Sequence, residues 1–289
     1  MERRNVEKVA VLGAGTMGAG IAQVAAAAGY ATALYDVGAE RARAALERIR
    51  ADLGKAVEKG KLESQARDRA LAALTLADDL GAACAGADLV IEAVPEDLAL
   101  KIEVLQKVAE IVGPDAVIAS NTSALSLTEI AHALPHPARV VGMHFFNPVP
   151  RMKLLEIVRA YQTSDETIAL AREVGARMGK EAIVVQDVPG FASSRLGIAL
   201  GMEAIRMLES GVASAEEIDK AMKLGYGHPM GPLELTDLVG LDVRLAIAEH
   251  LHRELGGTQF QPPQLLKRMV KAGKLGRKTG EGFYKYPRD

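Results

Sequence analysis

The stretch that decides the fold is Val9–Tyr35, which reads VAVLGAGTMGAGIAQVAAAAGYATALY. The hydrophobic period changes along this stretch. Val9–Leu12 is typical of a short buried strand, Met17–Ala28 indicates a helix that ends at Gly29, and Ala31–Tyr35 is typical of a second strand. The sequence therefore predicts a βαβ unit.

A glycine pattern, Gly13-x-Gly15-x-x-Gly18, joins the first strand to the helix. Gly13 can make the tight turn, Gly15 lets backbone N–H groups approach a pyrophosphate, and Gly18 allows the helix to pack on the strand. Thr16 and Met17 open the helix, whose N-terminus faces the anion. The pattern alone is weak evidence, but its strand–turn–helix context predicts a dinucleotide site.

Asp36 ends the second predicted strand. A carboxylate there can accept hydrogen bonds from the adenosine ribose hydroxyls and repels the 2′-phosphate of NADP, so we expect NAD as the cofactor. The alternative is that Asp36 only caps the following helix.

The composition is that of a soluble globular protein, with 289 residues, 49% hydrophobic content and 25% charged residues. A net charge of −2 gives no basic field, so we expect no nucleic-acid partner. The uncharged stretch Val9–Tyr35 imitates a membrane helix, but its many glycines and alanines argue against one. The single cysteine, Cys84, excludes an intrachain disulfide and fits a reducing cytoplasm.

The rest of the chain continues this α/β pattern and then changes. A long charged segment after Asp36 predicts an inserted helical pair, and further core strands are expected at 88–94, 116–120 and 140–144. Strand signals end at Gln186. We therefore expect a Rossmann-like, mostly parallel sheet with an inserted helical pair in residues 1–186, and an all-helical C-terminal domain in residues 187–289.

Two polar residues stand in apolar runs near the middle of the chain: His144 closes the strand beginning at Val140, and Glu156 lies within LLEIV. An unpaired buried carboxylate costs several kcal/mol, so a partner is expected. A carboxylate bonded to one imidazole nitrogen fixes the tautomer, while the other nitrogen can accept a proton. We predict that His144 and Glu156 form one general base. The other histidines show no convincing metal-binding spacing, so no metal is expected.

Seven motifs occur in order along nearly the whole chain: GAGTMGAGIA, IEAVPEDLALK, ASNTSALSLTEIA, GMHFFNPVPRMKLLEIV, DVPGF, GHPMGPLELTDLVGLD and GRKTGEGFYKY. Together they resemble the 3-hydroxyacyl-CoA dehydrogenase family, specifically its short bacterial 3-hydroxybutyryl-CoA dehydrogenases. The resemblance implies an NAD domain, a helical dimerisation domain that makes a homodimer, and NAD-dependent oxidation of (S)-3-hydroxyacyl-CoA to 3-oxoacyl-CoA.

The resemblance also implies roles for individual residues. His144 would be the general base, Glu156 its orienting partner, and Ser120 a hydrogen-bonding contact near the reacting oxygen. Further contacts to NAD would come from Glu96, Lys101, Ser120, Asn147 and Lys278. Lys55 and Lys59, which by themselves would be interpreted as a solvated face, occupy the segment that meets the CoA phosphates in the family.

One departure from the family pattern concerns the second domain. Family members often have PGFxxNR, whereas this chain has PGFASSR, which places Ser194 where a catalytic-site asparagine is common. A serine hydroxyl is shorter but can still donate a hydrogen bond. Activity is therefore compatible with this serine, while its role at the site stays open.

Three alternatives are set against this interpretation. The β-hydroxyacid dehydrogenases use a lysine in the helical domain, but no lysine follows DVPGF until Lys220. A non-catalytic NAD-binding relative would not need an intact His144 and Glu156. A 3-hydroxyadipyl-CoA dehydrogenase of aromatic degradation stays open, as do acyl chain length, reaction direction, and a place in fatty-acid or butanoate metabolism.

Overall fold

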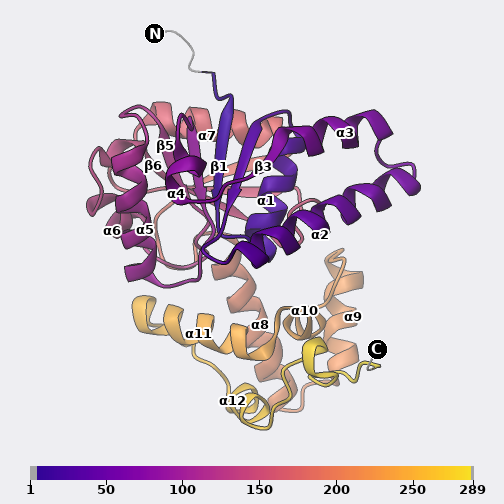
Figure 1. Ribbon diagram of the computed structural model, residues 1–289. Coiled ribbons are helices and arrows are strands. Elements are labelled where there is room, and N and C mark those ends of the chain that lie inside the picture. Colours follow the sequence, from indigo (N-terminus) through magenta and orange to yellow (C-terminus); the bar gives the residue numbers. More distant parts are fainter. Residues whose placement is uncertain (1–4, 288–289) are drawn as a thin grey trace. The chain divides into compact units, whose positions relative to one another are not determined.

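The computed structural model describes residues 5–287 and divides the chain into two compact units, one ending at Val188 and the other beginning at Pro189. The sequence-based boundary was Gln186. The first unit is a sheet flanked by helices and the second is helical (Figure 1), so the predicted fold class is confirmed.

The first unit holds an eight-stranded sheet in the order β3-β2-β1-β4-β5-β6-β7-β8. The strands β1 to β6 run parallel, whereas β7 is antiparallel to β6 and parallel to β8. Their bounds are β1 Lys8–Leu12, β2 Ala31–Tyr35, β3 Leu74–Leu76, β4 Leu89–Glu92, β5 Val117–Ser120, β6 Val140–Phe145, β7 Leu154–Arg159 and β8 Glu181–Gln186.

Helices cover both faces of this sheet. Residues from α1, α2, α3 and α7 share one hydrophobic core with alternate sheet residues such as Val9, Ile91 and Met143. The opposite face carries α5 and α6, because Lys101 of α5 bonds Glu92 and Leu127 of α6 lies against Gly142. The bounds are α1 Thr16–Ala27, α2 Ala39–Glu58, α3 Ser64–Ala73, α4 Leu80–Cys84, α5 Leu98–Ile111, α6 Leu127–His132, η1 Pro137–Arg139 and α7 Asp165–Arg177.

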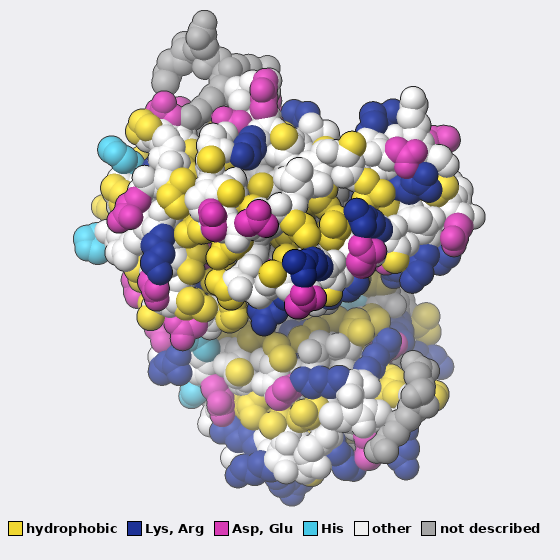
Figure 2. Space-filling model, viewed as in Figure 1, with side chains coloured by type: hydrophobic (Ala, Val, Ile, Leu, Met, Phe, Trp, Pro, Cys, Tyr) yellow, Lys and Arg dark blue, Asp and Glu magenta, His cyan; other side chains and the backbone are white. Residues whose placement is uncertain are grey.

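The inserted helical pair is α2 and α3, which pack against each other and against α1 (Figure 1). The buried side of α2 is formed by Ala42, Ala45, Ile49 and Leu53, at the three- and four-residue spacing of an amphipathic helix. Its other faces carry charges of both signs. Figure 2 shows the same mixing of acidic and basic side chains over the visible face of the first unit.

The second unit is built from α8 Ser193–Glu209, α9 Ala215–Gly225, α10 Pro232–Val239, α11 Leu241–Leu255, α12 Gln264–Lys271 and η2 Arg277–Thr279. Its core includes Ile198, Met202, Leu233, Leu251 and Leu266. Gly240 separates α10 from α11. Gly240 has φ +107°, a conformation that glycine adopts without steric cost and other residues avoid.

Two buried aspartates attach the C-terminal segment to the helices of this unit. Asp237 accepts hydrogen bonds from the backbone N–H groups of Phe283 and Tyr284, both at 2.9 Å. Asp219 accepts from the Tyr284 hydroxyl at 2.7 Å and from the first turn of α10. Burial raises the pKa of Asp237 despite the hydrogen bonds that it accepts. Through these hydrogen bonds the motif GRKTGEGFYKY holds the C-terminal segment against α9 and α10.

Candidate active site

A cavity of about 670 Å³ opens at the carboxyl ends of the first strands. The lining residues come from the glycine turn, the end of β2, the loop after β4 and helix α5. Of the predicted cofactor contacts, this cavity brings together Gly13, Gly15, Thr16, Met17 and Asp36. It lies where dinucleotides bind in open α/β sheets, next to the point at which the strand order reverses between β1 and β4.

Each of the three glycines in the turn is required, or tolerated, for a different geometric reason. Gly13 has φ +98°, and a Cβ there would lie 2.6 Å from the Ala93 carbonyl oxygen. A Cβ on Gly18 would lie 1.7 Å from the carbonyl oxygen of Gly13. Nothing lies within 4 Å of a Cβ on Gly15, the N-cap of α1. This open N-terminus of a 12-residue helix leaves room for an anion at its backbone N–H groups.

Asp36 is held in place by the loops around the cavity. Its Oδ2 accepts from the Ala14 N–H at 2.8 Å, and its Oδ1 accepts from the Gly38 N–H at 2.9 Å. The Arg41 guanidinium lies 3.3 Å from Oδ1. A carboxylate has about four acceptor positions, so Asp36 keeps capacity for the ribose hydroxyls. Arg41 and Lys107 are the two cations that line the same cavity.

Four polar side chains lie across the next strands of the sheet, at or near the carboxyl ends of β4, β5 and β6 and within the antiparallel β7. Strand pairing sets Glu92 opposite Ser120, and His144 opposite Glu156. Alternation along each strand places all four on the sheet face opposite the α1 core, because their neighbours Ile91, Ala119, Met143 and Leu155 belong to that core. Residues 12 to 64 positions apart in the sequence thus share one face of the sheet.

The imidazole and carboxylate predicted to act together are in contact. His144 Nδ1 lies 2.8 Å from Glu156 Oε2, with both side chains buried. The Phe146 ring lies 4.5 Å from the imidazole, centroid to centroid. The ladder between β6 and β7 fixes both backbones, so this contact is preorganised by the sheet. Because Nδ1 faces Glu156, a proton exchanged by this imidazole would enter or leave at Nε2.

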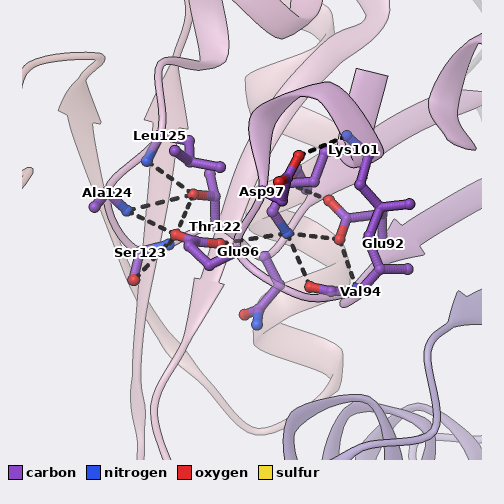
Figure 3. Close-up of polar contacts among 12 residues, drawn as sticks. Glu92, Val94, Glu96, Asp97, Lys101, Thr122, Ser123, Ala124 and Leu125 are labelled. Carbon is purple, nitrogen blue, oxygen red and sulfur yellow. Dashed lines mark hydrogen bonds and ion pairs between the residues drawn. The ribbon is translucent and has the colours of Figure 1, made fainter. Parts of the chain in front are cut away.

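A second buried ionic cluster lies at the ends of β4 and β5 (Figure 3). Glu92 Oε1 accepts from Lys101 Nζ and from the Val94 N–H, both at 2.7 Å. Its Oε2 accepts from the Ser120 hydroxyl at 2.6 Å. Glu92, Lys101 and Ser120 are all buried. A ligand could therefore contact Ser120 directly only if the surrounding side chains moved to expose it. The Lys101 ammonium likewise points toward Glu92 and not toward solvent.

Glu96 extends this cluster toward solvent. Its Oε2 lies 3.4 Å from Lys101 Nζ, and its Oε1 accepts from the Thr122 hydroxyl at 2.6 Å and the Ser123 N–H at 2.8 Å (Figure 3). Burial alone would raise the pKa of Glu96, but these hydrogen bonds and the Lys101 charge outweigh it and lower the pKa. Glu96 is therefore an ionised, partly exposed carboxylate between two loops.

Sequence reasoning missed two residues of this region. Glu92 ends the apolar run LVIE, which is the same signal that drew attention to Glu156 and could have identified it. Asn121 accepts from the Phe145 N–H through Oδ1 at 2.8 Å, tying the loop after β5 to the strand that carries His144. No sequence pattern indicates that contact.

The remaining predicted contacts are dispersed. Asn147 is exposed in the loop after β6, and Lys55 and Lys59 are exposed at the C-terminal end of α2. In the second unit, Ser194 is the second residue of α8. Lys278, also in that unit, lies 2.6 Å from Asp242 Oδ1 and lowers the pKa of that carboxyl.

Within residues 5–287, no group of three or more His, Cys, Asp or Glu side chains is arranged to hold a metal ion. Over the same residues, no helix has the length and apolar character needed to cross a membrane.

Two family models together match most of the chain. Residues 8–188 match the NAD binding domain of 3-hydroxyacyl-CoA dehydrogenase, and residues 190–286 match its C-terminal domain. The resemblance drawn from the seven motifs is thereby confirmed.

Individual proteins give the same result. The probable 3-hydroxybutyryl-CoA dehydrogenase of Bacillus subtilis is 46% identical, over 97% of this chain and 98% of the relative. The 3-hydroxybutyryl-CoA dehydrogenase of Mycobacterium tuberculosis strain H37Rv is 44% identical, over 97% of this chain and 99% of the relative. The crystal structure of (S)-3-hydroxybutyryl-CoA dehydrogenase from Ralstonia eutropha matches with a TM-score of 0.95 and 40% identity, covering 98% of this chain and all of that one.

Proposed function

The chain belongs to the 3-hydroxyacyl-CoA dehydrogenase family, and from that premise we propose that it oxidises (S)-3-hydroxybutyryl-CoA to the 3-oxoacyl-CoA with His144 as general base. The observation that carries the proposal is the 2.8 Å contact between His144 and Glu156, buried in the unit that also holds the dinucleotide cavity. The relatives named for 3-hydroxybutyryl-CoA support this substrate over the longer dicarboxylic alternative.

In this mechanism the chain's residues move one proton. NAD, when bound, supplies the acceptor for the hydride that leaves the substrate's C3. His144 takes the proton of the 3-hydroxyl at Nε2 as the C–O bond becomes a carbonyl. Glu156 stabilises the imidazolium that forms and keeps the ring in one orientation. In the reverse direction His144 returns the same proton to the oxygen.

The cavity fits the cofactor that this chemistry requires. Gly15 would admit the pyrophosphate to the N-terminus of α1, and Asp36 would bind the adenosine ribose. We retain Glu96, Lys101, Ser120, Asn147 and Lys278 as proposed contacts on the nicotinamide side. Ser194 is proposed to donate a hydrogen bond where relatives often have an asparagine.

We further propose that Lys55 and Lys59 meet the phosphates of CoA. They are four residues apart at the end of α2, so they lie on one face of the helix. Among the residues that the structure describes, neither ammonium forms an ion pair. Their helix-end position also suits basic side chains without a ligand, because it carries the negative end of the helix dipole.

Homodimerisation through the second unit and a cytoplasmic location complete the proposal. Leu196, Leu238 and Val243 are large apolar side chains that stand exposed on three helices of that unit. We propose that they belong to one apolar surface, which would be typical of an interaction site.

The test is the oxidation of NADH by acetoacetyl-CoA, followed by absorbance in the wild type and in His144→Ala. General-base catalysis typically contributes about 100- to 10,000-fold. The kcat of His144→Ala should therefore fall by at least about 100-fold, while NADH binding persists. His132→Ala, at an exposed position of the same unit, is the matched control and should keep full activity.

Glu156→Gln keeps the shape and removes the charge, so it should also lower kcat, and the double variant should be little worse than His144→Ala. If Glu156→Gln lowers only the melting temperature and leaves kcat unchanged, the carboxylate serves folding alone and the paired-base proposal is wrong.

A further inference from the structure

The cluster of Glu92, Glu96 and Lys101 is not explained by folding stability alone, because buried ion pairs contribute little net stabilisation. Glu92 and Lys101 are 0% and 1% exposed, and taking both ions out of water offsets much of their mutual attraction. Apolar residues of similar size often replace such pairs without loss of stability. The location of the cluster suggests what else it does.

The cluster lies directly behind the wall of the cofactor cavity. Ala93, Val94 and Pro95 line that cavity, and Glu92 Oε1 holds the Val94 N–H at 2.7 Å. Lys101 Nζ donates to the Val94 carbonyl at 3.2 Å. Both ions therefore fix the same short stretch of backbone, seen beside them in Figure 3.

The position along the sheet indicates which half of the dinucleotide is nearby. The strand order reverses between β1 and β4, and dinucleotides bind across this point in open α/β sheets. Asp36 follows β2 and is therefore on the adenosine side of it. The cluster stands at the ends of β4 and β5, on the other side, where the second nucleotide half binds in this fold. The oxidised nicotinamide ring carries a positive charge, and the reduced ring carries none.

The formal charges of the cluster do not cancel. Two carboxylates and one ammonium leave one negative charge, and the outermost member is Glu96, whose side chain is 39% exposed. Asp97, next in the chain, caps α5 by accepting from the Leu100 N–H and faces the positive end of that helix. The unbalanced charge on the nicotinamide side is thus that of Glu96.

We propose that this cluster discriminates between the oxidised and reduced cofactor by charge, with Glu92 as the positioning residue that holds Lys101 and the cavity wall in place. The inference rests on the NAD-dependent reaction proposed above, but it concerns cofactor binding alone. A net negative charge beside the nicotinamide stabilises bound NAD⁺ relative to bound NADH. Lys101, retained above as a proposed contact to NAD, contributes to this discrimination by offsetting the charge of one of the two carboxylates.

The experiment measures dissociation constants without any acyl-CoA, NADH by fluorescence titration and NAD⁺ by displacement of NADH. Glu92→Gln and Glu96→Gln each remove the net charge, so the ratio of the NAD⁺ to the NADH dissociation constant should rise by about three- to tenfold. Glu110→Gln, an exposed glutamate of α5, is the matched control and should leave the ratio unchanged. A purely structural role for Glu92 would weaken the binding of both forms equally.

Glu92→Gln leaves a buried ammonium and can fail to fold, which thermal melting would show before the titrations. The double variant Glu92→Gln/Lys101→Met removes both buried charges and restores the net charge of −1, so its ratio should return to the wild-type value. Glu96→Gln and this double variant keep the inference testable in that case. The inference would be overturned if Glu96→Gln left the ratio of the NAD⁺ to the NADH dissociation constant unchanged. It would also be overturned if the double variant raised this ratio as much as Glu96→Gln does.

Because these titrations need no substrate, failure of the charge inference leaves the proposed acyl-CoA reaction standing. Conversely, loss of the acetoacetyl-CoA activity would not affect the binding ratio.

Discussion

Asp36 is the residue that we propose distinguishes NAD from NADP, which carries an additional 2′-phosphate. Its carboxylate is fixed by the backbone of Ala14 and Gly38, so it cannot turn away from a 2′-phosphate without losing both bonds. Arg41 and Lys107, which line the same cavity, are positioned to attract a phosphate once the carboxylate is gone.

We expect Asp36→Ala to narrow the preference for NAD over NADP by about tenfold or more, the effect of removing one close repulsive charge. The measurement is kcat/KM with each cofactor at fixed acyl-CoA. Asp52→Ala, on the exposed side of α2, is the control. Equal efficiency with both cofactors in the unmodified protein would contradict the assignment of Asp36.

Polar residues in apolar runs were the most informative signal at this scale. The sequence alone was enough to predict the contact of His144 and Glu156, because a buried carboxylate needs a partner. The same reasoning would have found Glu92. The sequence does not reveal which groups donate hydrogen bonds to Glu92, because the bonds from Lys101 and Ser120 depend on the path of the loops and on strand register.

At the scale of elements, long periodic segments were predictable and short ones were not. The strand–turn–helix unit of the first 35 residues has a clear change of period. β3, with three residues, and α4, with five, are too short to show any period. The break between α10 and α11 is also hard to predict, because a single glycine inside an apolar helical pattern does not by itself reveal the positive φ of Gly240.

The end of α2 carries the proposed CoA contact. Lys59→Ala should raise the KM for acyl-CoA by about two- to fivefold, the range of an exposed ionic contact, and the effect should shrink as ionic strength increases. The KM for NAD should not change. Lys153→Ala, an exposed cation elsewhere in the first unit, is the control. If the KM for acyl-CoA is unaffected, Lys59 only stabilises the helix end.

Helix α11 contains a charge on its buried face. Arg244 lies in line with the buried residues Leu241, Ala248 and Leu251, and its Nε has no hydrogen-bond partner among the described residues. Burial lowers the pKa of Arg244 from its ordinary value to about 10. Because the folded value is the lower one, stability falls as the pH decreases through this range, and the cost is complete at neutral pH.

Replacing this buried cation by an apolar side chain should therefore stabilise the second unit. We expect Arg244→Met to raise the free energy of unfolding by about 1–4 kcal/mol at pH 7, measured by urea denaturation. Arg253→Met, at an exposed position of the same helix, should change it by no more than about 0.5 kcal/mol. A large loss of stability in Arg244→Met would mean that the guanidinium has a stabilising partner in solution.

At the scale of the whole molecule, the two units differ in how completely they bury their apolar residues. The sheet of the first unit is covered by helices on both faces, whereas the second unit has about a hundred residues and no β-strand up to residue 287, where the described part of the chain ends. A helical unit of that size buries a smaller share of its surface. Its exposed Leu196, Leu238 and Val243 are the apolar side chains that a partner copy would cover.

We accordingly expect light scattering to give twice the chain mass of 30.6 kDa at micromolar concentration. Leu196 is 71% exposed on α8, so Leu196→Asp should place a charge in the interface and shift the protein toward the monomer. Tyr161→Asp, an equally drastic change at an exposed position of the first unit, should leave the mass unchanged. A monomer in the wild type at these concentrations would show that the apolar face of the second unit serves something other than self-association.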